Sequence, residues 1–268
     1  LAFSLGLRRF IPQLRSYRID APISPHQFFR QVADVFRTAS ARIVVLAGVL
    51  YYAGVGTYVA LWAYIYSYFW EFTSEQISFI VIPMAVAALF LPPAIARWGV
   101  RHEKKTMAII GLLGGMVINV IPISLRLLGF FPENGSTTLF WIMLMAGFFE
   151  TMLLLLFDIS WRSMIADLTE QTELKTGRRN EGVISSTIAF TSKCSDALGT
   201  LIAGTLLTLI AFPTETAVGE VPESVITKLG LVYGPMIFLI WMGVILTISR
   251  YRISRLQHEK ILERLSKK

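Results

Sequence analysis

Apolar residues are gathered along this chain into long blocks, which polar connections separate. Six blocks reach the roughly 20 residues that a helix needs to cross the hydrocarbon core of a bilayer. They are residues 43–70, 77–96, 106–125, 138–165, 183–212 and 229–249. The first three blocks and the last contain no charged side chain. The pattern predicts an all-α, polytopic membrane protein in which residues 42–250 form a bundle of six transmembrane helices.

Composition favours the same class. Hydrophobic residues make up 54% of the 268 residues and charged residues only 16%, whereas about 25% of an average soluble domain is charged. The mean hydropathy is +0.59. We therefore expect the chain to lie in a lipid bilayer, and a soluble protein with unusually apolar core helices is disfavoured.

The basic residues alternate between connections. Lys and Arg concentrate in four segments, residues 1–41, 97–105, 166–182 and 251–268. The other three connections are mainly acidic and comprise residues 71–76, 126–137 and 213–228. Because Lys and Arg accumulate on the cytoplasmic side of short loops, we expect both termini in the cytoplasm of a multi-pass protein of the plasma or inner cell membrane. The net charge of +7 then reflects topology, and no nucleic-acid partner is expected.

The two ends of the chain are expected to lie outside the bundle. Residues 1–41 are predicted to form a central cytoplasmic linker with an amphipathic helix, and residues 251–268 a basic cytoplasmic tail. The linker helix can lie along the membrane surface or pack on the ends of other helices, and both possibilities stay open. The opening run 1–7 looks like the end of a longer apolar segment. We therefore expect the chain to be the C-terminal part of a longer protein.

Metal and redox chemistry have little support in the sequence. Cys194 is the only cysteine, so neither an internal disulfide nor a thiolate metal cluster is expected. His26, His102 and His258 lie far apart in polar segments, and we interpret them as solvated surface histidines. No metal site, cofactor or enzymatic activity is expected, since the chain has no His-rich pattern, no Gly-x-Ser-x-Gly and no phosphate-binding glycine loop.

Five ionisable residues fall inside the predicted fourth and fifth spans: Glu150, Asp158, Arg162, Lys193 and Asp196. Charges in a bilayer are costly and usually face a bundle interior or a cavity. At about 1.5 Å per residue, Glu150 and Lys193 are expected at similar depths on neighbouring helices. Asp158 and Arg162, four residues apart, can pair along one helix, as can Lys193 and Asp196. Neutralised packing pairs are one interpretation. We favour a polar lining of a solute pathway, because five charges exceed what packing requires.

Aromatic residues form a stripe on the first span. Tyr51, Tyr58 and Trp62 recur at helical spacing, and such a face can stack on a sugar or a lipid. Helix packing is the more common use of an aromatic stripe.

The most specific stretch follows the fourth span. Residues 163–186 read SMIADLTEQTELKTGRRNEGVISS. The stretch resembles the signature of the glycoside–pentoside–hexuronide:cation symporters, the melibiose-permease branch of the major facilitator superfamily. The matching positions are Asp167, Glu170, Glu173, Thr176, Gly177, Arg178, Arg179 and Glu181, together with Ala166, Gly182 and Lys193 in the next helix. A Trp98-Gly99 turn followed by Lys104 and Lys105 is similar to the family's short basic loop.

The resemblance implies a fold and a function. The six spans would match family helices seven to twelve, so the chain would be the C-terminal half of a major facilitator fold. Such a protein is a secondary active transporter, which would couple a sugar- or glycoside-type solute to Na⁺ or H⁺ by alternating access. The partner implied is an N-terminal six-helix half that holds most of the residues binding the coupling ion. Lys193 and Glu150 would serve the substrate or coupling network, and the stretch 163–186 would act as a cytoplasmic gate.

Two alternatives remain beside this interpretation. One is a transporter of the same fold that carries a lysolipid or another amphiphile. The other is a stand-alone six-helix scaffold or subunit without transport activity. The sequence leaves the solute, the coupling ion, its stoichiometry and the oligomeric state open.

Overall fold

The computed structural model describes residues 30, 33, 36, 38–99, 101–176, 181–213, 216–251, 253 and 255–266. The helices are α3 (Ala39–Tyr64) with its π-helical continuation η2 (Ile65–Phe69), α4 (Ser74–Phe90), α5 (Pro92–Gly99), α6 (Lys104–Leu127), α7 (Thr137–Thr176), α8 (Glu181–Leu209), α9 (Glu223–Ser249) and α10 (Arg255–Ser266). These residues contain no strand, which confirms the all-α prediction for the part of the chain described. The predicted linker helix falls mostly outside this part.

In the part of the chain that the structure describes, four helices are long and apolar enough to cross a membrane: α3 with η2, α6, α7 and α9. The pair α4 and α5 bends by 47° at its break and gives a fifth if it is one broken span. The sixth block corresponds to α8, which is long enough at 29 residues but less apolar, since it contains Lys193 and Asp196. Length and composition therefore support four or five of the six expected spans.

Local sequence explains where α4 begins and ends. Thr73 and Gln76 form a capping box, in which the Gln76 N–H donates to Thr73 Oγ1 at 3.2 Å and the Thr73 N–H donates to Gln76 Oε1 at 3.0 Å. Pro83 stays inside the helix, whereas the bend falls at Pro92, the first residue of α5. Proline has no N–H to donate and fits the first turn of a helix, so it ends α4 and starts α5.

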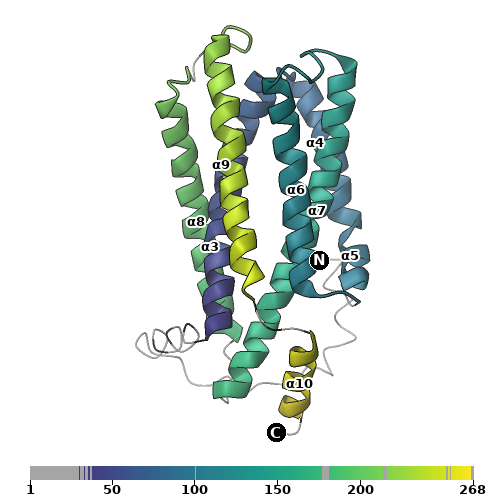
Figure 1. Ribbon diagram of the computed structural model, residues 1–268, viewed down its shortest axis with the longest axis vertical. Helices are drawn as coiled ribbons and strands as arrows, with labels where there is room; N and C mark the ends of the chain where they lie inside the picture. Colours follow the sequence, from purple (N-terminus) through teal and green to yellow (C-terminus); the bar gives the residue numbers. More distant parts are fainter. Residues whose placement is uncertain are drawn as a thin grey trace.

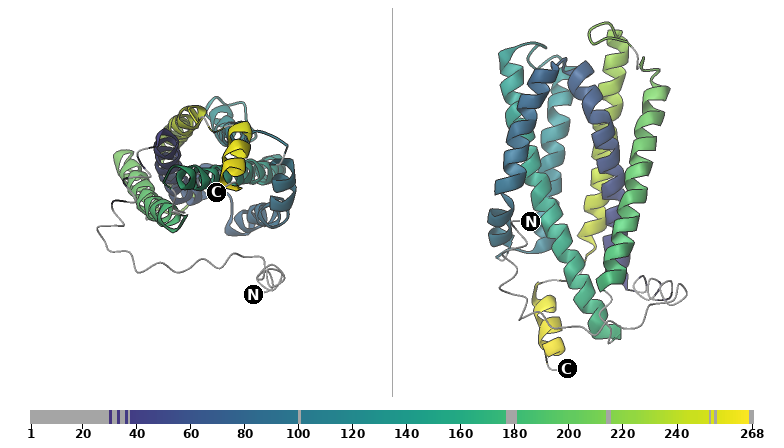
Figure 2. Two further views of the ribbon diagram at one scale, coloured as in Figure 1. Left: turned by 90° about the horizontal axis from the view of Figure 1, so that it is seen from below. Right: turned by 180° about the vertical axis from the view of Figure 1, so that it is seen from behind.

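Six of the described helices pack as two similar groups of three. Figure 1 and Figure 2 show these groups side by side. In one group α3 packs along α8 and α9, and in the other α7 packs along α4 and α6. The groups meet where α6 packs on α9 and, more narrowly, where α3 touches α7. Exchanging α3 with α7, α4 with α8 and α6 with α9 leaves this pattern unchanged. Such internal symmetry is common among transporters built from repeats.

Small residues allow the closest approaches within each group. A Cβ atom at Gly199 of α8 would overlap the carbonyl oxygen of Ala53 on α3, and one at Gly111 of α6 would overlap that of Leu153 on α7. The two pairs of helices therefore approach each other closely at Gly199 and Gly111. At Gly204, further along α8, a Cβ would meet nothing within 4 Å.

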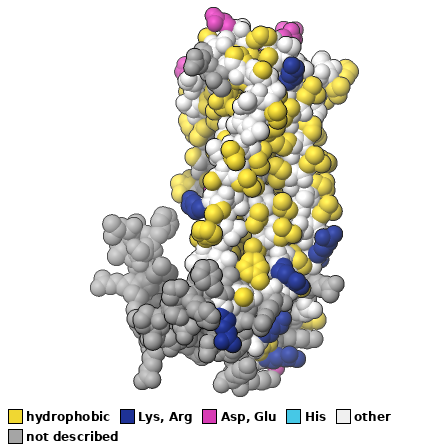
Figure 3. All heavy atoms as spheres, turned by 90° about the vertical axis from the view of Figure 1, so that its left-hand side faces the viewer, with side chains coloured by type: hydrophobic (Ala, Val, Ile, Leu, Met, Phe, Trp, Pro, Cys, Tyr) yellow, Lys and Arg dark blue, Asp and Glu magenta, His cyan; other side chains and the backbone are white. Residues whose placement is uncertain are grey.

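The outer surface is apolar along most of the bundle's length. Figure 3 shows hydrophobic side chains over one face, with acidic groups mainly at the upper end and basic groups mainly toward the lower end. Large exposed apolar side chains include Val59, Phe90, Phe190, Leu201 and Leu239. Such a belt suits contact with lipid tails. We name the end that carries Lys104, Lys105, Lys175 and α10 the basic end, and the opposite end the acidic end.

Candidate functional site

A buried carboxylate lies at the centre of the bundle. Glu150 of α7 is only 4% exposed. Its Oε1 accepts a hydrogen bond from Asn119 Nδ2 of α6 at 3.1 Å, and its Oε2 accepts one from the Tyr58 hydroxyl of α3 at 3.4 Å. Asn119 Nδ2 also donates to the Tyr233 hydroxyl of α9 at 3.2 Å. These four residues, the central cluster, join α3, α6, α7 and α9.

The central cluster supplies only neutral donors. Among the described residues, no Lys, Arg or His forms an ion pair with Glu150. A buried ionised carboxylate without a cation is costly in a medium of low dielectric constant. A proton or a small cation bound at this site would offset that charge.

A small cavity adjoins Glu150. It has a volume of about 20 Å³, and Asn119, Tyr233 and Tyr66 also line it. Asn119 Oδ1 is buried, and no described residue donates a hydrogen bond to it. A polar cavity of this size is large enough for one water molecule. A water or a small ion in it could bind both the Asn119 amide oxygen and the Glu150 carboxylate.

The expected opposition of Glu150 and Lys193 is not present. Lys193 is exposed on α8, and α8 packs along α3 rather than along α7. We expected α7 and α8 to pack on each other because they are consecutive in sequence, but they belong to different three-helix groups.

The other charges gather on one side of the bundle. Arg162 Nε donates to Asp158 Oδ2 at 2.7 Å, which confirms the expected i, i+4 pair. Lys193 and Asp196 form no such pair, although both are described. Both α7 and α8 flank the same part of α3, where the Tyr52 ring lies 5.7 Å from the Trp161 ring of α7 between centroids and a Cβ at Gly56 would overlap the Asp196 carbonyl oxygen of α8. We name Asp158, Arg162, Lys193 and Asp196 the charged face of α7 and α8, on which the Arg162 side chain is 65% exposed.

The aromatic stripe divides between packing and the central cluster. Tyr51 is buried with its ring centroid 4.4 Å from that of Phe157, so helix packing accounts for it. Tyr58 belongs to the central cluster. Trp62 is half-buried and stacks on Tyr66 with centroids 4.3 Å apart.

The motif after the fourth span lies largely on a helix. We expected a loop from residue 166, but α7 continues to Thr176. Glu173 is half-buried near the end of α7, and Glu181 is exposed at the first position of α8. The side chain of Thr176 and residues Gly177, Arg178 and Arg179 lie outside the described part, so the gate remains a prediction for them.

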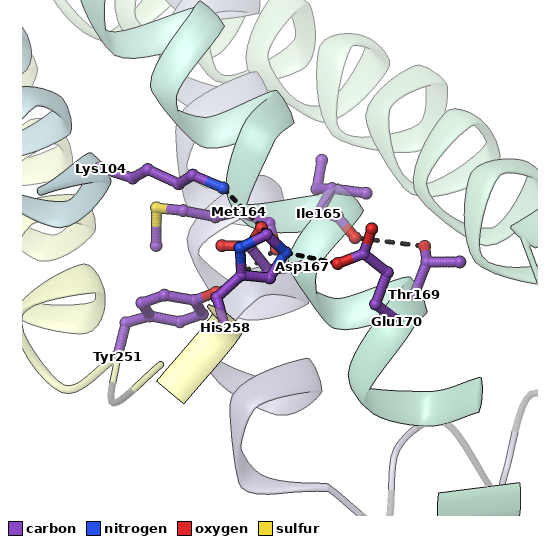
Figure 4. A network of polar contacts seen from close by, with 8 residues as sticks. All are labelled: Lys104, Met164, Ile165, Asp167, Thr169, Glu170, Tyr251 and His258. Carbon is purple, nitrogen blue, oxygen red and sulfur yellow. Dashed lines mark hydrogen bonds and ion pairs between the residues drawn. The ribbon is translucent and has the colours of Figure 1, made fainter. Parts of the chain in front are cut away.

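Asp167 and Glu170 of this motif meet two other segments at the basic end (Figure 4). Lys104 Nζ of α6 lies 2.5 Å from Asp167 Oδ1, and His258 Nε2 of α10 lies 3.3 Å from the same oxygen. His258 Nε2 also contacts Glu170 Oε2. We name Lys104, Asp167, Glu170 and His258 the basic-end cluster. The prediction that His258 is a solvated surface residue is wrong, because its side chain is only 20% exposed and binds two carboxylates.

The chain around the basic-end cluster is also held by hydrogen bonds. The Tyr251 hydroxyl donates to the Met164 carbonyl at 3.4 Å. Burial, and then the negative charge of Asp167, raise the pKa of the Tyr251 phenol, so it stays protonated and keeps its donor. Lys105 Nζ donates to the Tyr251 carbonyl at 3.3 Å. These bonds fix the segment between α9 and α10 against α7 and the start of α6.

Sequence reasoning missed three residues of these two clusters. Asn119 could have been found from the sequence, because it is the one amide side chain in the apolar block 106–125. Tyr233 gave no signal beyond being a tyrosine inside a span. His258 lies 88 residues after Glu170, and no sequence pattern links such distant positions.

The long apolar helices, the apolar outer belt and the buried polar centre define a multi-pass membrane protein. The chain belongs to the family described as MFS/sugar transport protein, whose model matches residues 6–255. Among curated proteins, the chain is similar to one from Escherichia coli (strain K12) named "Putative glycoside/cation symporter YagG", with 25% identity over 104 residues. The match covers 39% of this chain and 22% of that protein, so the matched part spans about a fifth of the relative's length.

Proposed function

We propose that this chain is the C-terminal six-helix half of a secondary active transporter, which moves a sugar- or glycoside-type solute together with Na⁺ or H⁺ by alternating access. Membership of a sugar-transport family and the name of the relative support the solute class. In this proposal α4 with α5 forms one broken span and α8 forms the sixth. The basic end faces the cytoplasm, in agreement with the positive-inside rule.

The charged face of α7 and α8 is the observation that carries the proposal. Arg162 and Lys193 are exposed, and Asp158 and Asp196 are partly exposed. Lipid-facing charges at membrane depth are costly, whereas protein or a water-filled cavity can accommodate them. The charged face must therefore be shielded from lipid. An N-terminal half that packs over it and encloses an aqueous pathway would shield it. Substrate sites in such folds lie between the two halves near the midplane.

Glu150 is the candidate coupling residue of this half. Among the described residues its carboxylate has no cationic partner, and Asn119 Oδ1 in the adjoining cavity has no hydrogen-bond donor. A proton or small cation bound here would offset the charge, and its loss would change the hydrogen bonds that join four helices. The N-terminal half would supply the remaining ion-binding residues.

Uptake by the complete protein, reconstituted into liposomes, tests the proposal. Radiolabelled glycosides are offered with an imposed Na⁺ gradient, an H⁺ gradient or none. We expect one gradient to drive accumulation, and Glu150→Gln to reduce driven uptake at least about tenfold, since a neutral amide does not exchange the ion. Glu133→Gln, in an exposed connection at the acidic end, is the matched control.

The outcomes separate three parts of the proposal, namely the role of Glu150, the solute class and the transport function. Driven uptake that Glu150→Gln leaves intact removes Glu150 from the coupling network and keeps the transporter. Accumulation of a lysolipid but of no glycoside replaces the solute class. Absence of driven uptake of any solute, with the protein correctly inserted, contradicts the transport function.

A further inference from the structure

Three side chains with metal-binding atoms converge where α10 meets α7. Asp167 and Glu170 come from α7 and His258 from α10, and one ligand atom of each lies within 4.8 Å of the others. In Figure 4 the His258 ring is directed at both carboxylates. We propose that these three residues form a binding site for a divalent transition-metal ion such as Zn²⁺, which joins α10 to α7.

The distances suit such an ion. Zn²⁺ binds imidazole nitrogen and carboxylate oxygen at about 2.0–2.2 Å in tetrahedral geometry, which places neighbouring ligand atoms about 3.3 Å apart. His258 Nε2 and Asp167 Oδ1 are separated by 3.3 Å. Small rotations of the Glu170 side chain, which is about one-third exposed, bring its oxygen to the third position.

An adjoining cavity gives the ion access and a fourth ligand. The cavity has a volume of about 300 Å³, and Asp167 and His258 line it together with His102 and Glu259. It is large enough to hold several water molecules. A site with three protein ligands and one water is a common arrangement for zinc.

The charges of the cluster favour a cation between the ligands. Two carboxylates face a single imidazole nitrogen, His258 Nε2. If this nitrogen is protonated, the two carboxylates share one hydrogen, and if it is not, its lone pair repels both of them. Lys104 compensates for one negative charge through its 2.5 Å contact with Asp167. A mixed set of imidazole and carboxylate is suited to Zn²⁺ and to related first-row ions. Lys104 therefore competes with the metal for Asp167.

This proposal does not depend on the transport function, because it concerns only contacts between α7 and α10. The prediction that the chain has no metal site rested on the distance between its histidines in sequence. One histidine suffices here, since the fold supplies two carboxylates from another segment.

Zinc titration of the intact protein tests the site. The protein is purified without a polyhistidine tag, stripped with a chelator and titrated with Zn²⁺ in competition with a chromogenic chelator. We expect one ion per chain. His258→Ala and Glu170→Gln should each weaken binding at least about tenfold, since each removes a ligand. Lys104→Met should tighten binding, because it removes the competing cation.

A matched control and a second measurement complete the test. His102→Ala removes a histidine that lines the same cavity and lies against the Trp98 carbonyl, and it should leave the affinity unchanged. Zn²⁺ should also slow amide hydrogen exchange in residues 255–266 of the wild type but not of His258→Ala. Equal affinity in wild type, His258→Ala and Glu170→Gln, or no saturable binding, overturns the proposal and leaves the cluster as an ion pair only.

Discussion

Asn119 links the buried carboxylate to the rest of the bundle. Its single amide nitrogen donates to Glu150 at 3.1 Å and to Tyr233 at 3.2 Å, so one side chain on α6 connects α7 with α9. An unsatisfied buried carboxylate is more costly than the loss of an ordinary hydrogen bond. Asn119 therefore contributes both to the stability of the bundle and to the hydrogen bonding of the Glu150 carboxylate.

We expect Asn119→Ala to lower the free energy of unfolding by about 1–3 kcal/mol, because it removes a donor to a buried charged group. Reversible denaturation in detergent micelles measures the change. Ser124→Ala on the same helix is the control. That hydroxyl donates to Val120 on an exposed surface, and its loss should cost no more than about 0.5 kcal/mol. Equal effects of the two substitutions would show that the cluster does not stabilise the bundle.

At the scale of elements, α7 differs most from its sequence-based prediction. Hydropathy placed the end of the fourth span at residue 165, yet the helix has 40 residues, a length of about 60 Å at 1.5 Å per residue. Glu, Leu and Lys after residue 165 are good helix formers, so the helix continues where its apolar face ends. This extension carries Asp167 and Glu170 beyond the expected apolar block to α10.

The contact between α3 and α8 depends on Gly199. We expect Gly199→Ala to destabilise the protein by about 1–3 kcal/mol, since the added methyl group would overlap the Ala53 carbonyl oxygen and push the helices apart. Gly204→Ala, one turn further along α8 with open space around it, should be neutral or stabilising by up to about 1 kcal/mol through helix propensity. Thermal unfolding of the two variants in one detergent measures both changes. A loss at Gly204 as large as that at Gly199 would contradict the packing of α8 on α3.

For the whole molecule, hydropathy was enough to predict an all-α, multi-pass membrane protein, and the motif at residues 163–186 was enough to predict the family. They did not predict which helices touch. Glu150 and Lys193 have similar expected depths, but depth along a helix says nothing about which neighbour a face meets. The two clusters also depend on contacts between segments that are distant in sequence, and no periodicity predicts such contacts. This applies to Asn119 and Tyr233 in the central cluster and to His258 in the basic-end cluster. The same packing left Arg162 and Lys193 exposed on one face of an otherwise apolar bundle.

The central claim is that this charged face lines an aqueous pathway between two halves of a transporter. Its most direct test is the reaction of a charged, membrane-impermeant thiol reagent with the complete protein, in a background where Cys194 is replaced by Ser. Lys193→Cys on the charged face is compared with Leu239→Cys, which is exposed on the apolar surface of α9. The account predicts rapid labelling of Lys193→Cys, slowed by the transported solute, and little labelling of Leu239→Cys. Equal labelling of the two variants, or no labelling of Lys193→Cys in any condition, would contradict it.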